Sequence, residues 1–160
     1  MDFDIDYGAD GKPLFSHVDL QFSVSHSADE MVVAFCSNTA IGIDIESGVR
    51  LQNPLAIAER YFSAEEYEFL QQTEKRLLRN TFLRLWVCKE AALKSSGHGL
   101  SGGLTTTSVR FDVESRVAIH RGVDGKQLTG LEFILAEGFR GALVAESAEY
   151  MENVKWFVLS

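Results

Sequence analysis

Two segments near the start of the chain have the hydrophobic patterns of β-strands. Residues 31–36 (MVVAFC) form a short apolar run, which is typical of a buried strand. Residues 41–46 (IGIDIE) alternate isoleucine with other residues, so one face of the predicted strand is apolar and the other is not. Because residues 37–40 (SNTA) have turn-forming side chains, we expect the two strands to pair as a hairpin.

The middle of the chain has the pattern of three helices. A first helix is predicted over residues 54–61, because Asn53 before a proline is a typical helix start. Ser63 and Glu66 form a capping box, which predicts the start of a second helix. The longest helix is predicted over residues 74–95, where apolar residues recur at spacings of three and four. Its apolar face consists of Leu78, Phe82, Leu85, Trp86 and Leu93, and Gly97 and Gly99 end it.

The last third of the chain has the composition of strands. They are predicted at residues 108–113, 117–120, 131–136, 141–146 and 154–159, with glycine-containing turns at 122–125 and 137–138. Strands followed by helices and again by strands predict an α+β fold, in which a mainly antiparallel sheet has helices packed on one face. The length of 160 residues favours a single domain over residues 1–160.

Charge and composition narrow the class of function. The chain has 23 acidic and 15 basic residues, and this net charge of −8 argues against a general nucleic-acid partner. Cys36 and Cys88 belong to no CxxC pair, so we expect free thiols in a reducing cytosol. There is no signal-peptide pattern and no apolar run near the ~20 residues of a membrane helix. We therefore expect a cytoplasmic protein with no membrane partner.

Asp44 and Glu46 are the first candidates for chemistry. Residues two apart on a strand face the same side, so both carboxylates share the face opposite the isoleucines, and Gly42 leaves space beside them. Adjacent carboxylates repel each other unless a cation lies between them, and a hard cation such as Mg²⁺ prefers oxygen ligands. The alternative is a solvated strand face that carries two exposed acids.

A second group of candidates lies on the predicted long helix. Trp86, Glu90 and Lys94 are spaced four apart and form one stripe. Glu90 can serve as a third oxygen ligand or as a general base, and Lys94 can neutralise an anionic substrate, with Lys89 nearby in the sequence. The alternative is an ordinary glutamate–lysine pair on a helix surface, with Trp86 in the core.

A third element, residues 22–27 (FSVSHS), combines serines with His26. Hydroxyl groups, backbone N–H groups and the imidazole can all donate hydrogen bonds to a phosphate. The alternative is a capping box of Ser27 and Glu30 in a short turn, with His26 merely exposed.

In their order along the chain, the three elements resemble those of the phosphopantetheinyl transferase family, and most closely its broad-specificity branch, which activates peptide and polyketide synthetases. That branch has the elements F-N-x-S-H-S, G-[IV]-D-[IV]-E and W-x-x-K-E-[AS]-x-x-K. Here they are residues 22–27 (FSVSHS), 42–46 (GIDIE) and 86–94 (WVCKEAALK), and residues 11–13 (GKP) and 97–100 (GHGL) match two further elements. The resemblance implies Mg²⁺-dependent transfer (or Mn²⁺-dependent transfer) of 4′-phosphopantetheine from coenzyme A to a serine of an acyl or peptidyl carrier protein, with release of 3′,5′-ADP.

The resemblance also implies roles for individual residues. Asp44, Glu46 and Glu90 would bind the cation together with the pyrophosphate of coenzyme A. Glu90 would be the base for the carrier serine, and Lys94 would stabilise the diphosphate as 3′,5′-ADP departs. The other expected contacts with coenzyme A are Lys12, Pro13, Ser25, His26, Ser27 and Lys89.

The resemblance begins partway into the family's usual length. Members of this branch are similar to two related lobes with the active site between them, and we expect this sequence to lack most of the first lobe. A shorter branch resembles a single lobe and completes its site by oligomerising, which implies a homo-oligomer here. Ser23 stands where the family has asparagine, so coenzyme A binding is expected to be weaker if that position supports the phosphate loop.

Two other functions remain open alongside transfer. One is a non-catalytic module that binds coenzyme A or a carrier, and the other is a metal-dependent hydrolase of diphosphate bonds. The basic residues are concentrated around the long helix, where they either steer an acidic carrier protein or form a solvated face. These residues are Lys75, Arg76, Arg79 and Arg84.

Overall fold

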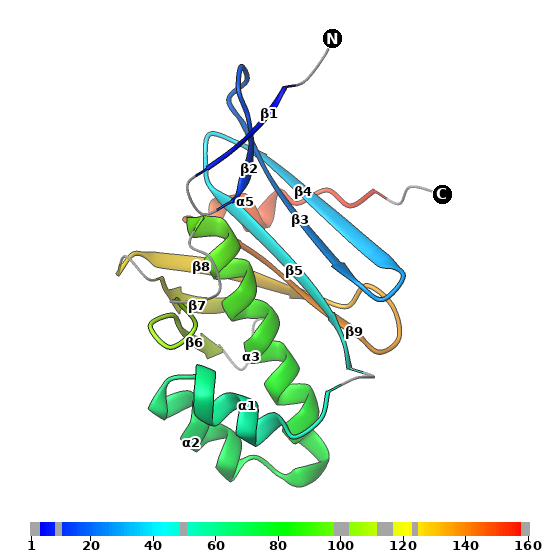
Figure 1. Ribbon diagram of the computed structural model, residues 1–160, viewed down its shortest axis with the longest axis vertical. Helices are drawn as coiled ribbons and strands as arrows, with labels where there is room; N and C mark the ends of the chain where they lie inside the picture. The colour runs from blue at the N-terminus through cyan, green and yellow to red at the C-terminus, as the bar shows by residue number, and fades with distance from the viewer. Residues whose placement is uncertain are drawn as a thin grey trace.

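The computed structural model of the protein describes residues 4–8, 11–48, 51–97, 103–111, 117–122 and 125–157 (Figure 1). The strands are β1 (Ile5–Tyr7), β2 (Pro13–Phe15), β3 (Leu20–Ser27), β4 (Glu30–Ser37), β5 (Ile41–Ser47), β6 (Ser108–Phe111), β7 (Val117–Arg121), β8 (Gln127–Phe133) and β9 (Phe139–Ala145). The helices are α1 (Pro54–Tyr61), α2 (Ala64–Gln72), α3 (Lys75–Ser96) and the short α5 (Glu149–Glu152).

The predicted α+β class and the mainly antiparallel sheet are confirmed. A five-stranded sheet has the order β5-β9-β8-β7-β6, every described pairing is antiparallel, and β1–β2 and β3–β4 form separate hairpins. Helix α3 crosses one face of the large sheet, with α1 and α2 packed at its N-terminal end (Figure 1). Met151 of α5 packs on the opposite face, against Leu143 and Ala145 of β9.

The predicted pairing of residues 31–36 with residues 41–46 was wrong. Strand β4 pairs with β3, which the sequence analysis did not predict as a strand, and β5 pairs with β9. A period of two shows that a segment is a strand but does not specify its partner, so neighbours in sequence were assumed to be neighbours in the sheet. The segment 154–157 is also not a strand, and the rest of the strand predicted there lies outside the described residues.

The helix ends follow the predicted capping residues. The Asn53 side chain accepts a hydrogen bond from the backbone N–H of Ala56 (3.4 Å), and the Ser63–Glu66 capping box is present in both directions. Helix α3 ends at Gly97, whose φ of 75° is a left-handed conformation that glycine adopts without a steric cost. Residues 98–100 of the glycine element lie outside the described residues.

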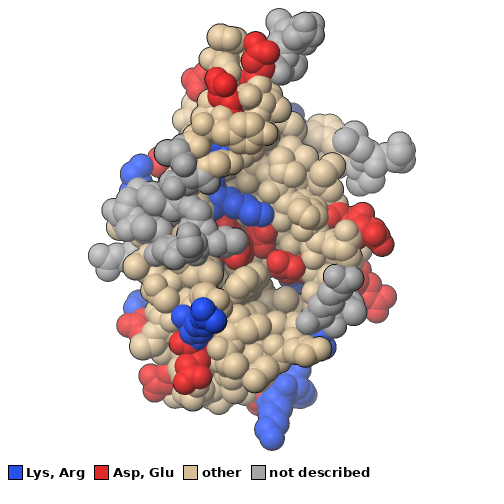
Figure 2. Space-filling model, viewed as in Figure 1, with Lys and Arg blue, Asp and Glu red and all other residues tan. Residues whose placement is uncertain are grey.

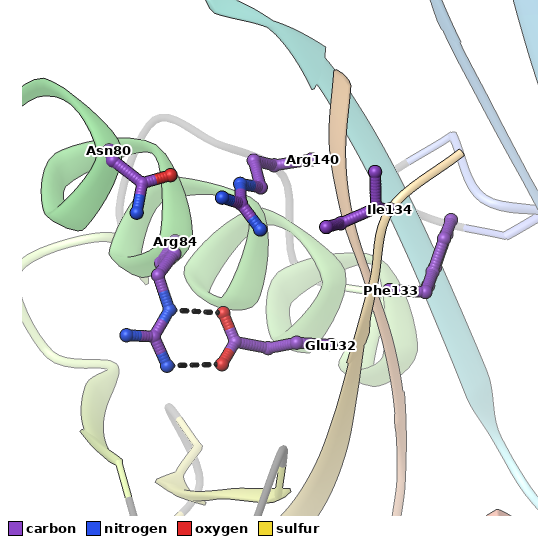
Figure 3. Close-up of a pocket in the computed structure, with 6 residues that line it drawn as sticks. All are labelled: Asn80, Arg84, Glu132, Phe133, Ile134 and Arg140. Atoms are coloured by element: carbon purple, nitrogen blue, oxygen red, sulfur yellow. Dashed lines mark hydrogen bonds and ion pairs between the residues drawn. The ribbon is translucent and has the colours of Figure 1, made fainter. Parts of the chain in front are cut away.

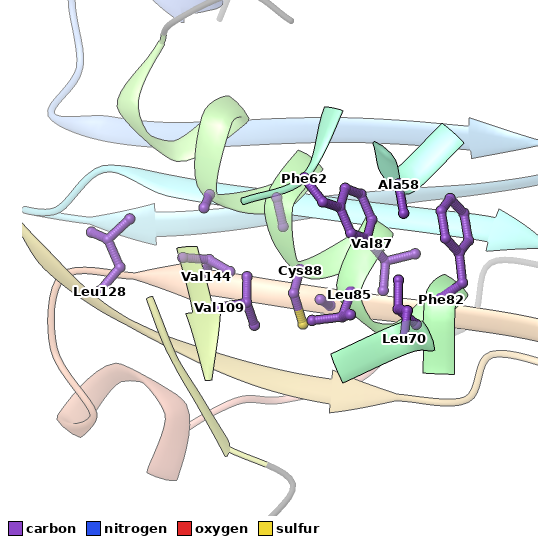
Figure 4. Close-up of a cluster of buried hydrophobic side chains, with 13 residues drawn as sticks. Ala58, Phe62, Leu70, Phe82, Leu85, Val87, Cys88, Val109, Leu128 and Val144 are labelled. Carbon is purple, nitrogen blue, oxygen red and sulfur yellow. The ribbon is translucent and has the colours of Figure 1, made fainter. Parts of the chain in front are cut away.

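The main hydrophobic core lies between α3, α1, α2 and the sheet (Figure 4). The rings of Phe62 and Phe82 stack with centroids 5.1 Å apart, and Trp86 stacks on Phe82 at 5.7 Å. Burying an aromatic side chain of this kind contributes roughly 2–3 kcal/mol, so this stack ties α1 to α3. Cys36 and Cys88 are free thiols, as predicted. Among the described helices, none has the length and apolar character needed to cross a membrane.

Candidate active site

Close contact between α3 and β5 creates the candidate site, and Gly42 permits it. A Cβ atom at Gly42 would collide with the carbonyl oxygen of Ala91 and would lie 2.5 Å from the backbone nitrogen of Ser95. Only glycine therefore lets the helix backbone rest on the strand at this point. The face of β5 beside Gly42 carries Asp44 and Glu46, so the contact brings the stripe of α3 against both acids.

Asp44 is buried, with 4% of its surface exposed, so the solvated strand face is ruled out for this residue. Its Oδ1 atom accepts hydrogen bonds from Lys94 Nζ (2.7 Å) and from the Ser25 hydroxyl (2.8 Å). Its Oδ2 atom is buried and has no hydrogen-bond partner. Burial raises the pKa of Asp44 to about 6, although Lys94 and Ser25 act in the opposite direction.

Glu90 and Glu46 complete a group with Asp44 that we call the acid cluster. Burial, followed by the charge of Asp44, raises the pKa of Glu90 to about 7, and the charge of Glu46 adds to the rise. No described side chain donates a hydrogen bond to the Glu90 carboxylate. Within the described part of the chain, no three acidic, histidine or cysteine side chains lie together in a way that could hold a metal ion, so the acid cluster does not converge on one metal position in this structure. The acid cluster thus concentrates negative charge around Lys94 and the unpartnered oxygen.

Alternate serines of β3 hold β5 and two of its acids. The hydroxyls of Ser23, Ser25 and Ser27 accept hydrogen bonds from the backbone N–H groups of the facing strand, at 3.1, 3.2 and 3.0 Å; the donors are Ile43, Ile45 and Ser47. Ser25 and Ser27 also donate to Asp44 and to Glu46, the latter at 3.1 Å. These side chains take the place of a strand neighbour on the β5 side. On its other side the segment pairs with β4 along its whole length, with Ser27 opposite Glu30, so it is a strand and not the capping box of the alternative prediction.

His26 and the GKP element are placed differently from the serines. Because side chains alternate along a strand, His26 lies on the opposite face of β3 from Ser25, and it is exposed. Lys12 Nζ donates to the carbonyl oxygens of Ser95 (2.9 Å) and Ile41 (3.1 Å), and burial lowers its pKa. Pro13 begins β2. The lysine therefore caps the last turn of α3, next to the acid cluster.

Lys89 does not reach the site, which corrects its predicted contact with coenzyme A. Its side chain is fully buried, its Nζ donates to Glu66 (2.6 Å) and to the carbonyl oxygen of Thr107, and burial lowers its pKa. Neighbouring residues on a helix point about 100° apart, so Lys89 is directed into the core next to α2, whereas Glu90 is directed toward β5.

The sequence analysis missed an apolar pocket beside Glu46. The pocket has a volume of about 200 Å³ and is lined by Glu46, Ser47, Leu51, Ile57, Phe82, Leu83 and Trp86. The signal for it was present, because Trp86 begins the stripe that contains Glu90. Figure 2 shows acidic atoms next to basic ones near the middle of the face that carries α3 and β5. An acidic centre flanked by Lys94 and Lys12, with an apolar pocket beside it, is suited to an elongated anionic ligand that binds with a cation.

Comparisons with known proteins identify the class. The family model of the 4′-phosphopantetheinyl transferase superfamily matches residues 40–144, and the chain belongs to this superfamily. It is 32% identical over 145 residues to the 4′-phosphopantetheinyl transferase Sfp of Bacillus subtilis (strain 168), covering 90% of this chain and 63% of that protein. It is 36% identical over 110 residues to the 4′-phosphopantetheinyl transferase psf-1 of Bacillus pumilus, covering 68% and 46%.

A solved holo-[acyl-carrier-protein] synthase of Thermotoga maritima is similar at 18% identity and a TM-score of 0.47, covering 76% of this chain and 79% of that one. The chain thus spans about half to two thirds of the length of the two curated relatives described above.

Proposed function

We propose that this protein transfers the 4′-phosphopantetheine group of coenzyme A to a serine of an acyl or peptidyl carrier protein, releasing 3′,5′-ADP. The observation that carries the proposal is the buried Asp44 carboxylate, which keeps one oxygen without a partner and lies near enough to Glu90 for its charge to raise the pKa of that residue. A buried carboxylate oxygen without a hydrogen-bond partner costs free energy in a protein that uses it only for folding. Membership of the superfamily and the related transferases support the same reaction.

The donor chemistry of the acid cluster suits a hard divalent cation, although its three carboxylates do not converge on one metal position in this structure, so cation binding would have to draw them together. Its donors are carboxylate oxygens, which Mg²⁺ and Mn²⁺ prefer. Asp44 Oδ2 has no hydrogen-bond partner, so it can accept a bond from a ligand without losing another. We propose that Asp44, Glu46 and Glu90 hold Mg²⁺, with further oxygens from the pyrophosphate. When bound, the cation would offset the charge of the acids and the diphosphate and stabilise the charge that develops as the phosphorus–oxygen bond breaks.

In this proposal each residue near the cluster has a defined task. The carrier serine attacks the β-phosphate and gives its proton to Glu90, whose carboxylate is not engaged by any described donor. Lys94 moves from Asp44 to the diphosphate and stabilises the departing 3′,5′-ADP. Ser25 and Ser27 orient the acids, which revises their predicted contact with phosphate.

Of the remaining family-like contacts, Lys12 and Pro13 border the cluster at the end of α3. His26 lies on the outer face of β3 beside Met31, away from the cluster, so it would contact a nucleotide only at an interface with a second copy. The apolar pocket beside Glu46 receives the uncharged pantetheine arm.

We also propose that a second copy of the chain covers the outer face of the β3–β4 hairpin. Met31, Val33 and Phe35 expose 67%, 41% and 59% of their surface there, on one face of a hairpin with no third strand among the described residues. An exposed apolar sheet face of this kind is typical of an interface. Light scattering at working concentration should give a mass above the monomer, and a monomer would contradict this assembly.

The transfer is tested by intact-mass spectrometry of an apo carrier protein incubated with this protein, coenzyme A and Mg²⁺. The carrier should gain the mass of one phosphopantetheine group, and chelation with EDTA should stop the gain until Mg²⁺ is restored. Glu90→Gln should slow transfer by about 10²- to 10⁴-fold, as expected for loss of a general base, while Glu59→Gln on the exposed side of α1 should not. Binding of coenzyme A without transfer to any of several carriers would instead indicate a binding module, and release of phosphopantetheine without a carrier would indicate a hydrolase.

A further inference from the structure

A second charged pocket lies on the side of α3 that faces β8, whereas Lys94 faces β5. It has a volume of about 230 Å³ and is lined by Asn80, Arg84, Glu132, Phe133, Ile134 and Arg140 (Figure 3). Asn80 and Arg84 come from α3, Glu132 from β8 and Arg140 from β9. The proposed transfer assigns no role to these residues.

One ion pair in this pocket is already complete. Arg84 donates two hydrogen bonds to Glu132, at 2.9 and 2.6 Å, and its guanidinium lies 4.2 Å from the centroid of the Phe111 ring. Such a bidentate pair fixes both side chains and cancels their charges. The charge of Arg84 is therefore not available to balance another group.

Arg140 is the unbalanced charge of the pocket. It is partly buried, and among the described residues no acidic group or other acceptor pairs with it. Counting Arg84, Glu132 and Arg140, the pocket carries one net positive charge in a chain whose formal net charge is −8. A partly desolvated guanidinium with no acid bonded to it is a site where an anion gains more than it does in water.

Arg140 supplies the main donors that an oxyanion would need in this pocket. In Figure 3, the side-chain oxygen of Asn80 lies on the side of Arg140, above the Arg84–Glu132 pair, so Asn80 would offer its amide donor to an anion after its side-chain amide rotates. A guanidinium presents two parallel N–H groups to a carboxylate or phosphate, and an amide adds a further donor. Ile134 borders the same space and is 58% exposed. We propose that this pocket binds a small oxyanion, a carboxylate or a phosphate group, through Arg140 and Asn80.

The pocket lies next to the acid cluster but is separate from it. Arg140 is the Cα partner of Glu46 across β5 and β9, so both side chains lie on the same face of the sheet. No hydrogen bond or ion pair joins them among the described residues. Oxyanion binding can therefore be measured without coenzyme A, Mg²⁺ or a carrier, and it does not depend on the transfer activity.

The test is a titration of the ¹⁵N-labelled protein with sodium phosphate, and separately with sodium acetate, at constant ionic strength and without Mg²⁺. Saturable shifts of the Asn80 side-chain amide and the Arg140 Nε–H signal are expected, and the tighter of the two anions shows whether the natural ligand is a phosphate or a carboxylate. Arg140→Gln should weaken binding by about tenfold or more, because it removes a charge-assisted bidentate contact. Lys155→Gln removes the same charge from an exposed position and should change nothing.

Asn80→Asp keeps the test decisive if Arg140→Gln disturbs the fold. It places a carboxylate opposite Arg140 and supplies the missing counter-ion from within the chain, so the variant should stay folded and lose anion binding. Shifts that rise linearly without saturation for both anions, or equal binding by the wild type, Arg140→Gln and Asn80→Asp, would overturn the proposal.

Discussion

Helix α3 carries two lysines that pair with buried carboxylates, and the two pairs differ in how completely they are bonded. Lys89 and Glu66 lie 2.6 Å apart; Glu66 also accepts from the backbone N–H groups of Ser63 (2.9 Å) and Val109 (2.8 Å). Both oxygens of Glu66 are therefore used. Lys94 and Asp44 lie 2.7 Å apart, but Asp44 keeps one buried oxygen without a partner.

The difference separates an ion pair that stabilises the fold from one that is available for chemistry. Glu66 is held by backbone N–H groups at the start of its own helix α2 and in β6, so any movement of this pair would disturb both elements. Asp44 is held by side chains, and the charges of Lys94 and Glu46 act on it in opposite directions. A saturated pair gains nothing from a ligand, whereas a cation bound as proposed would give the free oxygen of Asp44 a partner.

The largest expected effect on the free energy of unfolding comes from replacing the lysine of each ion pair in turn. Lys89→Met should destabilise the protein by about 3–5 kcal/mol, because it leaves the Glu66 charge buried without a counter-ion. Lys94→Met should cost less, about 1–2 kcal/mol, since its side chain is 32% exposed and solvent screens part of the interaction. Urea unfolding of the metal-free variants at pH 7 measures both free energies. A larger loss for Lys94→Met than for Lys89→Met would contradict this assignment of the two pairs.

The locations of the acid cluster and of its stripe on α3 were predictable, because each depends on periodicity within one element. Asp44 and Glu46 share a strand face, and Glu90 and Lys94 share a helix stripe. The contact of Gly42 with α3 could not be derived from spacing, since it joins segments that are far apart in the sequence.

The bonds made by the serines were also beyond the sequence analysis. The FSVSHS element was expected to donate to phosphate, but its hydroxyls replace backbone partners of β5. A serine can bond equally well to a ligand, a carboxylate or a backbone amide, so its partner depends on the tertiary structure. Lys89 could have been placed correctly, because it lies four residues after Leu85 and thus on the apolar face of the helix.

The pH dependence of stability extends the comparison of the two ion pairs to Glu90, the neighbour of Asp44 in the acid cluster. The pKa of Glu90 rises from 4.5 to about 7 on folding, so the folded state binds this proton more tightly than the unfolded state. Its contribution to stability is present below pH 4.5 and is lost as the pH rises through about 7. Over that range the metal-free wild type should lose about 2–3 kcal/mol relative to Glu90→Gln.

Urea unfolding of the two proteins at a series of pH values in EDTA measures this difference. Glu59→Gln, which removes an exposed carboxylate from α1, is the matched control and should keep the wild-type dependence. Parallel curves for Glu90→Gln and the wild type would show that Glu90 ionises as an ordinary surface acid.

The smallest expected effect comes from the serines that hold the cluster. Ser25→Ala removes the acceptor for the backbone N–H of Ile45 and the donor to Asp44, whereas Ser23→Ala removes only the acceptor for Ile43. Each variant should lose about 1 kcal/mol of stability. Ser25→Ala alone should also slow transfer by about tenfold, because Asp44 loses the bond that orients it.

Comparing the two variants isolates the role of the hydrogen bond to Asp44. Both hydroxyls are buried in β3, and both accept a hydrogen bond from the backbone of β5. For a positioning residue, kcat should fall and the affinity for Mn²⁺, measured by electron paramagnetic resonance, should weaken in Ser25→Ala but not in Ser23→Ala. Equal losses in the two variants would mean that the serines serve only the backbone of β5. Asp44 would then be oriented by Lys94 alone, and the difference between the two ion pairs of α3 would rest on the unpartnered oxygen.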